Sequence, residues 1–151
     1  MSELCPCCSG KLYRTCCQPL HKGKISASSA EALMRSRYSA YALQQFAYVL
    51  HTYAKAQQVD FSLTDLAQDA DITEWLHLVI EASTTHSVRF KAYYRVQNKL
   101  YMLHELSEFV QEQGEWRYTT GDIQPDSGVV KHERNAVCFC GSDKKFKRCH
   151  G

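Results

Sequence analysis

The residues best suited to chemistry are eight cysteines, and none of them lies between Cys17 and Cys138. Each end of the chain carries one pattern, C-x-C followed after eight residues by C-[CH]. The pattern comprises Cys5, Cys7, Cys16 and Cys17 and, at a constant offset of 133, Cys138, Cys140, Cys149 and His150. Four thiolate or imidazole ligands form the set that binds zinc tetrahedrally. The sequence therefore predicts two zinc ions, one in each cluster.

The clustering of the cysteines disfavours disulfides, because a disulfide framework usually spreads its cysteines along the chain. It also disfavours catalysis at the metal, because a catalytic zinc keeps one position open and each cluster offers four protein ligands. Two roles remain open: a zinc site that only folds a terminus, and a docking surface. Cys8 stands where the second copy has Gly141. We expect its thiol to be spare, with a role as ligand as the alternative.

The C-terminal stretch CFCGSDKKFKRCHG, residues 138–151, resembles the SEC-C motif, the zinc-binding tail of the SecA translocase. The N-terminal copy is less similar, because Cys8 and Leu12 replace a glycine and a lysine. The whole chain resembles the YchJ family of small bacterial proteins of undefined function through LMRSRYSAY (33–41), TEWL (73–76) and LHELSEF (103–109). This resemblance implies a SEC-C motif at each end of a cone-shaped, nuclear-transport-factor-like or cystatin-like middle domain.

The middle of the chain predicts helices followed by strands. Ser28 and Glu31 have the spacing of a capping box that opens a helix through about Ala42. A second amphipathic helix is expected over residues 46–53 from apolar spacing, and a short third helix around residues 62–70. Alternating patterns then predict four strands, over residues 75–82, 88–96, 100–111 and 115–122. Helices followed by an antiparallel meander indicate an α+β fold, with the helices packed on one sheet face.

The chain divides into four predicted segments. These are a zinc motif (1–24), the α+β cone domain (25–123), a linker (124–135) and a second zinc motif (136–151). The composition, 44% hydrophobic and 23% charged, is ordinary for a soluble protein. The sequence has neither a run of about 18 apolar residues nor the start of a signal peptide. We therefore expect a cytoplasmic protein without membrane contact.

A pocket in the cone is a second candidate site. We take the even-numbered face of the third strand as the core face, which places His104 and Glu108 among apolar residues. Trp116 and Tyr118 share that register, and the first helix adds the remaining candidate lining residues, Arg35 and Arg37. A histidine and a glutamate could do acid–base work there. The alternative is a histidine satisfied within the core and arginines on a salt-bridged face.

Basic residues make the C-terminal motif a candidate partner-binding surface: Lys144, Lys145, Lys147 and Arg148. With zinc and thiolates counted, residues 131–151 keep a charge of about +3 and residues 1–24 only about +1. A basic surface of this kind suits an acidic protein or a ribonucleoprotein. The resemblance to the SecA tail implies chaperone or ribosome contact, and any nucleic-acid contact would be unspecific. Two hypotheses follow: a non-catalytic interaction module, or a ligand-binding or enzymatic cone with purely structural zinc motifs.

Overall fold

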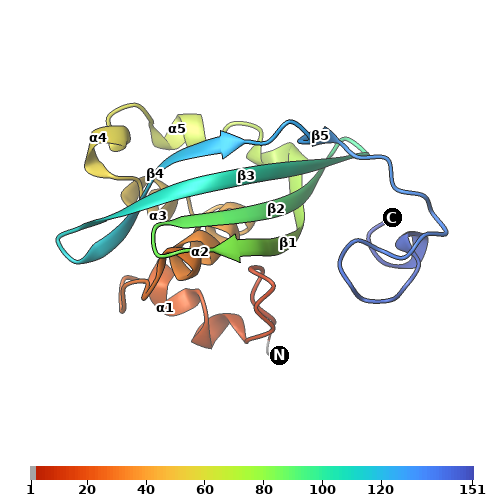
Figure 1. The fold of residues 1–151 in the computed structure, drawn as a ribbon, viewed down its shortest axis with the longest axis horizontal. Helices are drawn as coiled ribbons and strands as arrows, with labels where there is room; N and C mark the ends of the chain where they lie inside the picture. The colour runs from red at the N-terminus through yellow and green to blue at the C-terminus, as the bar shows by residue number, and fades with distance from the viewer. Residues whose placement is uncertain (1–2) are drawn as a thin grey trace.

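The computed structural model describes residues 3–151 as an antiparallel sheet with helices on one face (Figure 1). Strands β1 to β4 follow one another in order, and the short β5 pairs with β3. The strands are β1 Thr73–Ser83, β2 Ser87–Val96, β3 Lys99–Glu112, β4 Glu115–Ile123 and β5 Gly128–Val129. The helices are α1 Gln18–His21, α2 Ala30–Ala42, α3 Phe46–His51, α4 Lys55–Gln58 and α5 Leu63–Leu66. The predicted α+β class is confirmed. None of the helices in residues 3–151 has the length and apolar character needed to cross a membrane.

Helix α2 begins one residue later than the capping-box spacing predicts. The cap is Ser29, whose hydroxyl accepts a hydrogen bond of 3.1 Å from the amide of Ala32. Glu31 is therefore in the first turn of the helix and does not close a box with Ser28. Its carboxylate instead pairs with Arg35 one turn later, at 3.2 Å, which is the favourable i,i+4 arrangement on a helix surface.

Two-residue turns connect β2 to β3 and β3 to β4. In the first turn, Gln97 and Asn98 have φ of 49° and 70°, and in the second, Gln113 and Gly114 have φ of 53° and 80°. Positive φ at both positions is typical of the type I′ turn, whose twist matches the flanking strands. These turns set the register of the strand pairs beside them, and a bulge between Glu108 and Phe109 shifts the register of β3 with β4 farther from the turn.

The register across the second turn differs from the prediction about the faces of the sheet. Residues paired across antiparallel strands share a face, and Phe109 pairs with Tyr118. Odd-numbered residues of β3 therefore share the helix-covered face with Trp116 and Tyr118 of β4. His104 and Glu108 are even-numbered, so they lie on the opposite, outer face, because successive side chains of a strand point to opposite faces.

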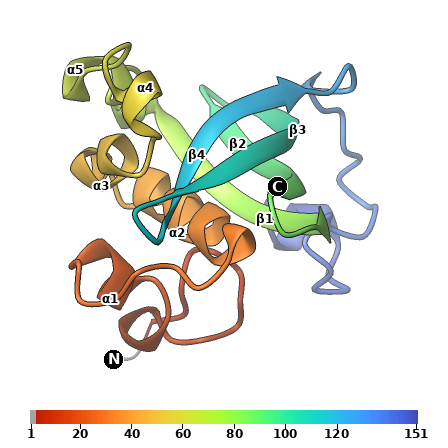
Figure 2. The same cartoon turned by 60° about the vertical axis from the view of Figure 1, so that its left-hand side comes forward.

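The main core lies between α2 and the inner face of the sheet. Its largest members are Tyr38 from α2, Phe90 from β2, Phe109 from β3 and Trp116 from β4. A smaller core lies on the outer face, where Leu100 of β3 packs with Phe146 and Cys138 from the end of the chain. Figure 2 shows the sheet between the helices and this C-terminal segment. The sheet thus has protein packed against both faces.

Candidate metal centres

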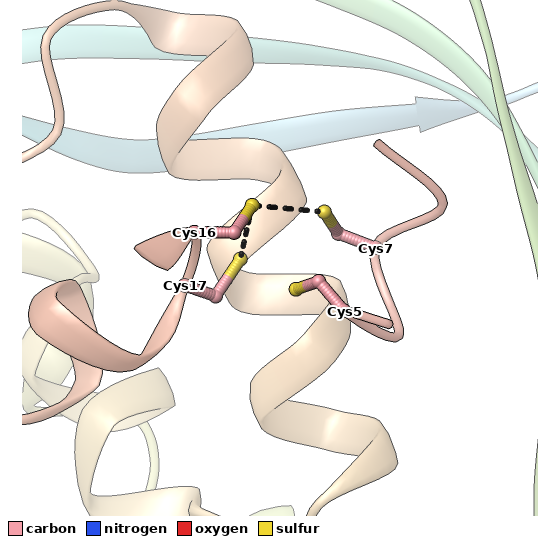
Figure 3. A group of neighbouring side chains, drawn as sticks. All are labelled: Cys5, Cys7, Cys16 and Cys17. Atoms are coloured by element: carbon pink, nitrogen blue, oxygen red, sulfur yellow. Dashed lines mark hydrogen bonds between the residues drawn. The ribbon is translucent and has the colours of Figure 1, made fainter. Parts of the chain in front are cut away.

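The structure brings the four N-terminal cysteines, Cys5, Cys7, Cys16 and Cys17, into one cluster, with all four sulfur atoms within 4.8 Å of one another (Figure 3). The Sγ atoms of Cys7 and Cys16 are 3.6 Å apart, and those of Cys16 and Cys17 are 4.0 Å apart. A tetrahedron with Zn–S distances of about 2.3 Å has edges of about 3.8 Å. The spacing and the thiol donor set therefore fit a zinc ion at the centre.

The C-terminal cluster has the same arrangement with one imidazole in place of a thiol. Its ligand atoms, from Cys138, Cys140, Cys149 and His150, also lie within 4.8 Å of one another. The Nδ1 atom of His150 is 3.2 Å from the Sγ of Cys138 and 3.3 Å from that of Cys149. The sulfurs of Cys140 and Cys149 are 3.4 Å apart. This cluster offers three thiolates and one imidazole to a metal.

The two clusters are held by segments with equivalent backbone structure. We call these segments the N-terminal knuckle (residues 4–17) and the C-terminal knuckle (residues 137–150). The amide of Cys5 donates to the carbonyl of Lys11 at 2.8 Å, and Cys138 donates to Lys144 at 2.8 Å. Two further features match at the offset of 133: the bridges Leu4–Leu12 and Val137–Lys145, and the 3₁₀ turns Tyr13–Thr15 and Phe146–Arg148. The ligand spacing therefore specifies one local structure twice.

Each knuckle also places a hydroxyl beside its third ligand. The Oγ of Ser9 is 3.2 Å from the Sγ of Cys16, and the Oγ of Ser142 is 3.5 Å from that of Cys149. A hydroxyl that donates to sulfur stabilises the thiolate, the form that binds metal. The serines are therefore suited to support the ligands in both copies.

The electrostatics of the N-terminal cluster favour a bound cation. The neighbouring thiols of Cys17 and Cys5 lower the pKa of Cys7. Contacts with Cys5 and Cys7, followed by burial, raise the pKa of Cys17. Neighbouring thiols in a buried site cannot all ionise unless a positive charge offsets their repulsion. A divalent metal would supply such a charge.

Cys8 lies outside the group of four. It has φ of 65°, in the left-handed region, and its counterpart Gly141 has φ of 79°. This turn directs the Cys8 side chain away from the cluster, so that its Sγ lies 3.3 Å from Nδ1 of His77 and accepts from the amide of Leu78 at 3.5 Å. The N-terminal cluster is complete without it.

The N-terminal knuckle packs against helix α2. The Nη1 of Arg35 donates to the carbonyl of Cys7 at 2.7 Å. His21, just after the knuckle, donates from Nε2 to the carbonyl of Ser36 at 2.8 Å, and its Nδ1 accepts from the hydroxyl of Tyr13 at 2.7 Å. Burial lowers the pKa of His21, which favours the neutral ring that this pair of bonds requires. Contacts with α2 at Cys7 and at His21 thus join both ends of the knuckle to the core.

The C-terminal knuckle packs against the outer face of the sheet. The ring of Phe139 stacks on Tyr93 of β2, with centroids 4.1 Å apart and planes inclined by 16°. Arg95, also of β2, donates to the carbonyl of His150 and pairs with Glu74 at 3.1 Å. We call this contact an arginine clamp. The N-terminal knuckle has an equivalent clamp at Arg35, because in each case an arginine paired with a glutamate donates to the carbonyl of a candidate ligand.

His77 of β1 lies between the two knuckles. It contacts Cys8 of the first, and its ring centroid is 6.2 Å from that of Phe139 and 6.3 Å from that of His150 in the second. Burial, followed by the charge of His150, lowers the pKa of His77. The two knuckles therefore approach each other at this position of β1.

All four predicted partner-binding side chains of the C-terminal knuckle are exposed. Lys144, Lys145 and Arg148 line one shallow hollow. Lys147 is exposed beside them in the 3₁₀ turn. The knuckle therefore packs on the sheet through its aromatic residues and leaves its positive charges in solvent.

The predicted pocket residues separate into three groups. Arg37 and Tyr118 line a cavity of about 330 Å³ between α2 and the sheet. Trp116 packs in the core, and Arg35 holds the N-terminal knuckle. On the outer face, His104 bridges Glu81 and Asp126 at 2.6 and 2.7 Å, and Glu108 is exposed.

Glu105 is the acidic residue of the cavity, and sequence analysis missed it. It is 8% exposed and lies on the inner face of β3, next to the predicted His104. The signal that could have found it is the two-residue turn at Gln113–Gly114. Counting strand pairs from that turn places the odd-numbered residues of β3 beside Trp116 and Tyr118.

Comparison with known families assigns both parts of the chain. Residues 29–121 match the family model described as the YchJ middle NTF2-like domain. Residues 1–19 and 134–151 match the model of the SEC-C motif. A UPF0225 protein of Actinobacillus succinogenes is 40% identical over 100% of this chain and 98% of its own length. The chain belongs to the YchJ family. A UPF0225 protein of Geobacter sulfurreducens is 38% identical over 100% of this chain and 99% of its own length.

Two solved structures in the comparison are described as SEC-C motif-containing proteins. The solution structure of one from Rhodopseudomonas palustris has a TM-score of 0.72 and 33% identity, and covers 81% of this chain and 98% of its own. The crystal structure of one from Psychrobacter arcticus has a TM-score of 0.68 and 33% identity, and covers 97% of this chain and 94% of its own. The fold is therefore shared with solved proteins that contain a SEC-C motif.

Proposed function

We propose that both clusters bind zinc and that the protein is a non-catalytic interaction module. Each cluster supplies four soft or borderline ligands at tetrahedral spacing. A complete set of protein ligands leaves no coordination position for a substrate or a reactive water. The zinc ions would then fold the knuckles and fix their side chains, since metal binding provides the folding free energy of such small motifs.

The C-terminal knuckle is the proposed contact surface, and the exposure of its four basic side chains is the observation that carries the proposal. Its aromatic residues are used against the sheet, so the lysines and the arginine remain available to a partner. The partner would be a protein or ribonucleoprotein with an acidic or phosphate-bearing surface, because clustered positive charge steers association with such surfaces.

The repeat provides a matched control for testing this proposal. Lys144 and Lys147 in the C-terminal knuckle correspond to Lys11 and Arg14 in the N-terminal knuckle. Reversal of either pair to glutamate changes the net charge equally, at equivalent backbone positions. Zinc-loaded full-length protein and both double variants would be used to capture partners from cell lysate, with captured protein and RNA quantified at low and high salt.

We expect Lys144→Glu/Lys147→Glu to lose most of the captured material and Lys11→Glu/Arg14→Glu to keep it. Capture by the unchanged protein should also fall with salt, because exposed charges are screened. Equal capture by the two variants would contradict the assignment of the contact surface to the C-terminal knuckle.

A further inference from the structure

The cavity between α2 and the sheet is enclosed mainly by aromatic rings. Its volume of about 330 Å³ is at the lower end of the range for small-molecule sites. Tyr38, Tyr53, Trp75, Phe90 and Tyr118 form much of its wall. Apolar walls with a few fixed polar groups are typical of pockets that bind organic molecules.

Arg37 is fixed in this wall and is 6% exposed. Its Nη1 donates to the carbonyl of Val49 at 2.9 Å and to the hydroxyl of Thr52 at 2.6 Å. The guanidinium carbon lies 4.4 Å from the ring centroid of Tyr53 and 4.5 Å from that of Tyr118. Of its five donor hydrogens, these two acceptors engage only those on Nη1, so further donors remain for a ligand.

Glu105 contributes a carboxylate of which only one oxygen accepts hydrogen bonds from the part of the chain that the structure describes. Its Oε2 accepts from the hydroxyls of Ser107 at 2.5 Å and Tyr118 at 3.0 Å. Within residues 3–151, no donor reaches its Oε1, and no arginine or lysine forms an ion pair with it. The carboxylate lies against Gly121, where any side chain would collide with it. The Oε1 atom is not fully enclosed by protein atoms, so it is available to a ligand that supplies a donor.

Tyr38 adds a third polar group without a partner. Its side chain is 4% exposed, and within residues 3–151 its hydroxyl makes no hydrogen bond to another group. Burial raises the pKa of Tyr38, so the hydroxyl keeps its proton. The cavity therefore offers a donor from Arg37, an acceptor from Glu105 and a hydroxyl that can do either.

The charges around the cavity decide between classes of ligand. An organic cation would suit a carboxylate among aromatic rings, but the guanidinium of Arg37 already occupies the faces of Tyr53 and Tyr118. An anion would suit Arg37, but the unpaired charge of Glu105 repels it. Because the two buried charges balance, an uncharged molecule adds no net charge to a low-dielectric site.

We propose that this cavity is a binding site for a small, flat, uncharged organic molecule that donates a hydrogen bond to Glu105 and accepts one from Arg37. Aromatic amides carry both groups next to one another on a planar frame. The aromatic walls would stack on the ring of such a molecule. The lining of the cavity includes no candidate metal ligand and none of the exposed basic residues of the C-terminal knuckle.

Benzamide is a suitable probe, with benzoate and benzylamine as charged controls that keep the ring. Each would be titrated into the zinc-loaded full-length protein while amide signals of α2 and β3 are followed by NMR. We expect benzamide to shift these signals with a Kd of about 1 mM or tighter, as a good contact for a molecule of this size. Both charged molecules should bind at least about tenfold more weakly. Absence of benzamide binding, or equal binding of the charged controls, would overturn the proposal in favour of a cavity that holds only water.

Two variants on the same strand separate the site from the surface. Glu105→Gln keeps the shape of the side chain but removes its negative charge and one of its two acceptor oxygens, so benzamide should bind about tenfold more weakly. Glu108→Gln makes the same change three residues away on the outer face and should leave binding unchanged. Equal affinity in the two variants would exclude Glu105 as the contact.

A third variant covers the case in which Glu105→Gln fails to fold. Ala92 lines the cavity and is 1% exposed. Ala92→Leu adds apolar volume inside the cavity, which a cavity of this size can accommodate, and should abolish benzamide binding while the protein still melts cooperatively. Unchanged benzamide affinity in Ala92→Leu would show that the probe binds elsewhere and would also overturn the proposal.

Discussion

The N-terminal and C-terminal knuckles have the same ligand spacing and backbone hydrogen bonds, yet they pack on different parts of the domain. The first lies against α2 with three of its four ligands buried, and the second lies on the outer face of the sheet with one buried. Position 6 is proline in the first, and the equivalent position 139 is the phenylalanine that stacks on Tyr93. The ligands therefore specify the local fold, and the residues between them specify where the knuckle docks.

The two knuckles also differ in how much of their charge remains in solvent. In the C-terminal knuckle, aromatic packing holds the motif while all four basic side chains stay exposed. The N-terminal knuckle has Leu12 in place of Lys145 and carries less positive charge. The same motif thus occurs once as a knuckle joined closely to the helical core and once as a knuckle with an exposed basic surface.

The largest expected effect comes from removing one ligand at equivalent positions. Cys7→Ser and Cys140→Ser should each reduce the zinc content from about two ions to about one per chain, because structural zinc requires its full ligand set. Cys7→Ser should lower the melting temperature more, since its cluster is buried against α2. Elemental analysis and thermal melts check both. If either variant loses both ions, the two centres are not independent.

The docking of the C-terminal knuckle can be broken without touching its ligands. Phe139→Ala removes the ring stacked on Tyr93 and should destabilise the protein by about 1–2 kcal/mol, the value of a half-buried aromatic contact. Zinc content should stay unchanged. Pro6→Ala at the equivalent N-terminal position is the control and should have a smaller effect. Chemical denaturation measures the difference, and equal losses would contradict the packing difference between the knuckles.

The two arginine clamps should act on one centre each. Arg35→Met removes the donor to the carbonyl of Cys7, and Arg95→Met removes the donor to that of His150. Each lost hydrogen bond is worth about 1 kcal/mol, which corresponds to zinc release roughly fivefold faster if all of it appears in the rate. Chelator-driven zinc release should show two phases, with one accelerated in each variant. Acceleration of the same phase by both substitutions would show that the clamps are not specific.

The smallest effect is expected at Cys8. Cys8→Gly relieves a left-handed conformation worth about 1–2 kcal/mol but loses the contacts with His77 and Leu78 and adds freedom to the unfolded chain. The net change in stability should stay within about 1 kcal/mol. Zinc content should be unchanged and one reactive thiol lost, as measured by elemental analysis and thiol titration. Loss of a zinc ion in this variant would show that Cys8 is a ligand.

The features of the fold that depend on local spacing could be predicted from the sequence. The ligand pattern at an offset of 133 indicated both clusters, because tetrahedral coordination constrains only the ligands and the turns between them. The alternation of apolar residues likewise located the four long strands. The start of α2 was predicted one residue early, since Ser28 and Ser29 are both capping residues and only the backbone decides between them.

The faces of the third strand were predicted incorrectly, and the docking contacts of the knuckles were not predicted. The side chains of His104 and Glu105 are adjacent in sequence but point to opposite faces of the sheet. An error of one residue in register therefore assigns His104 to the cavity in place of Glu105. Docking depends on contacts between residues far apart in sequence, such as Phe139 with Tyr93 and Arg35 with Cys7. No local pattern encodes such pairs.

The most direct test of the two metal centres is the zinc content of the full-length chain, purified freshly under reducing conditions. Elemental analysis should find about two zinc ions per chain, with the eight cysteines free of disulfides. Protein without metal, in which the cysteines of each cluster are joined as disulfides, would contradict the account.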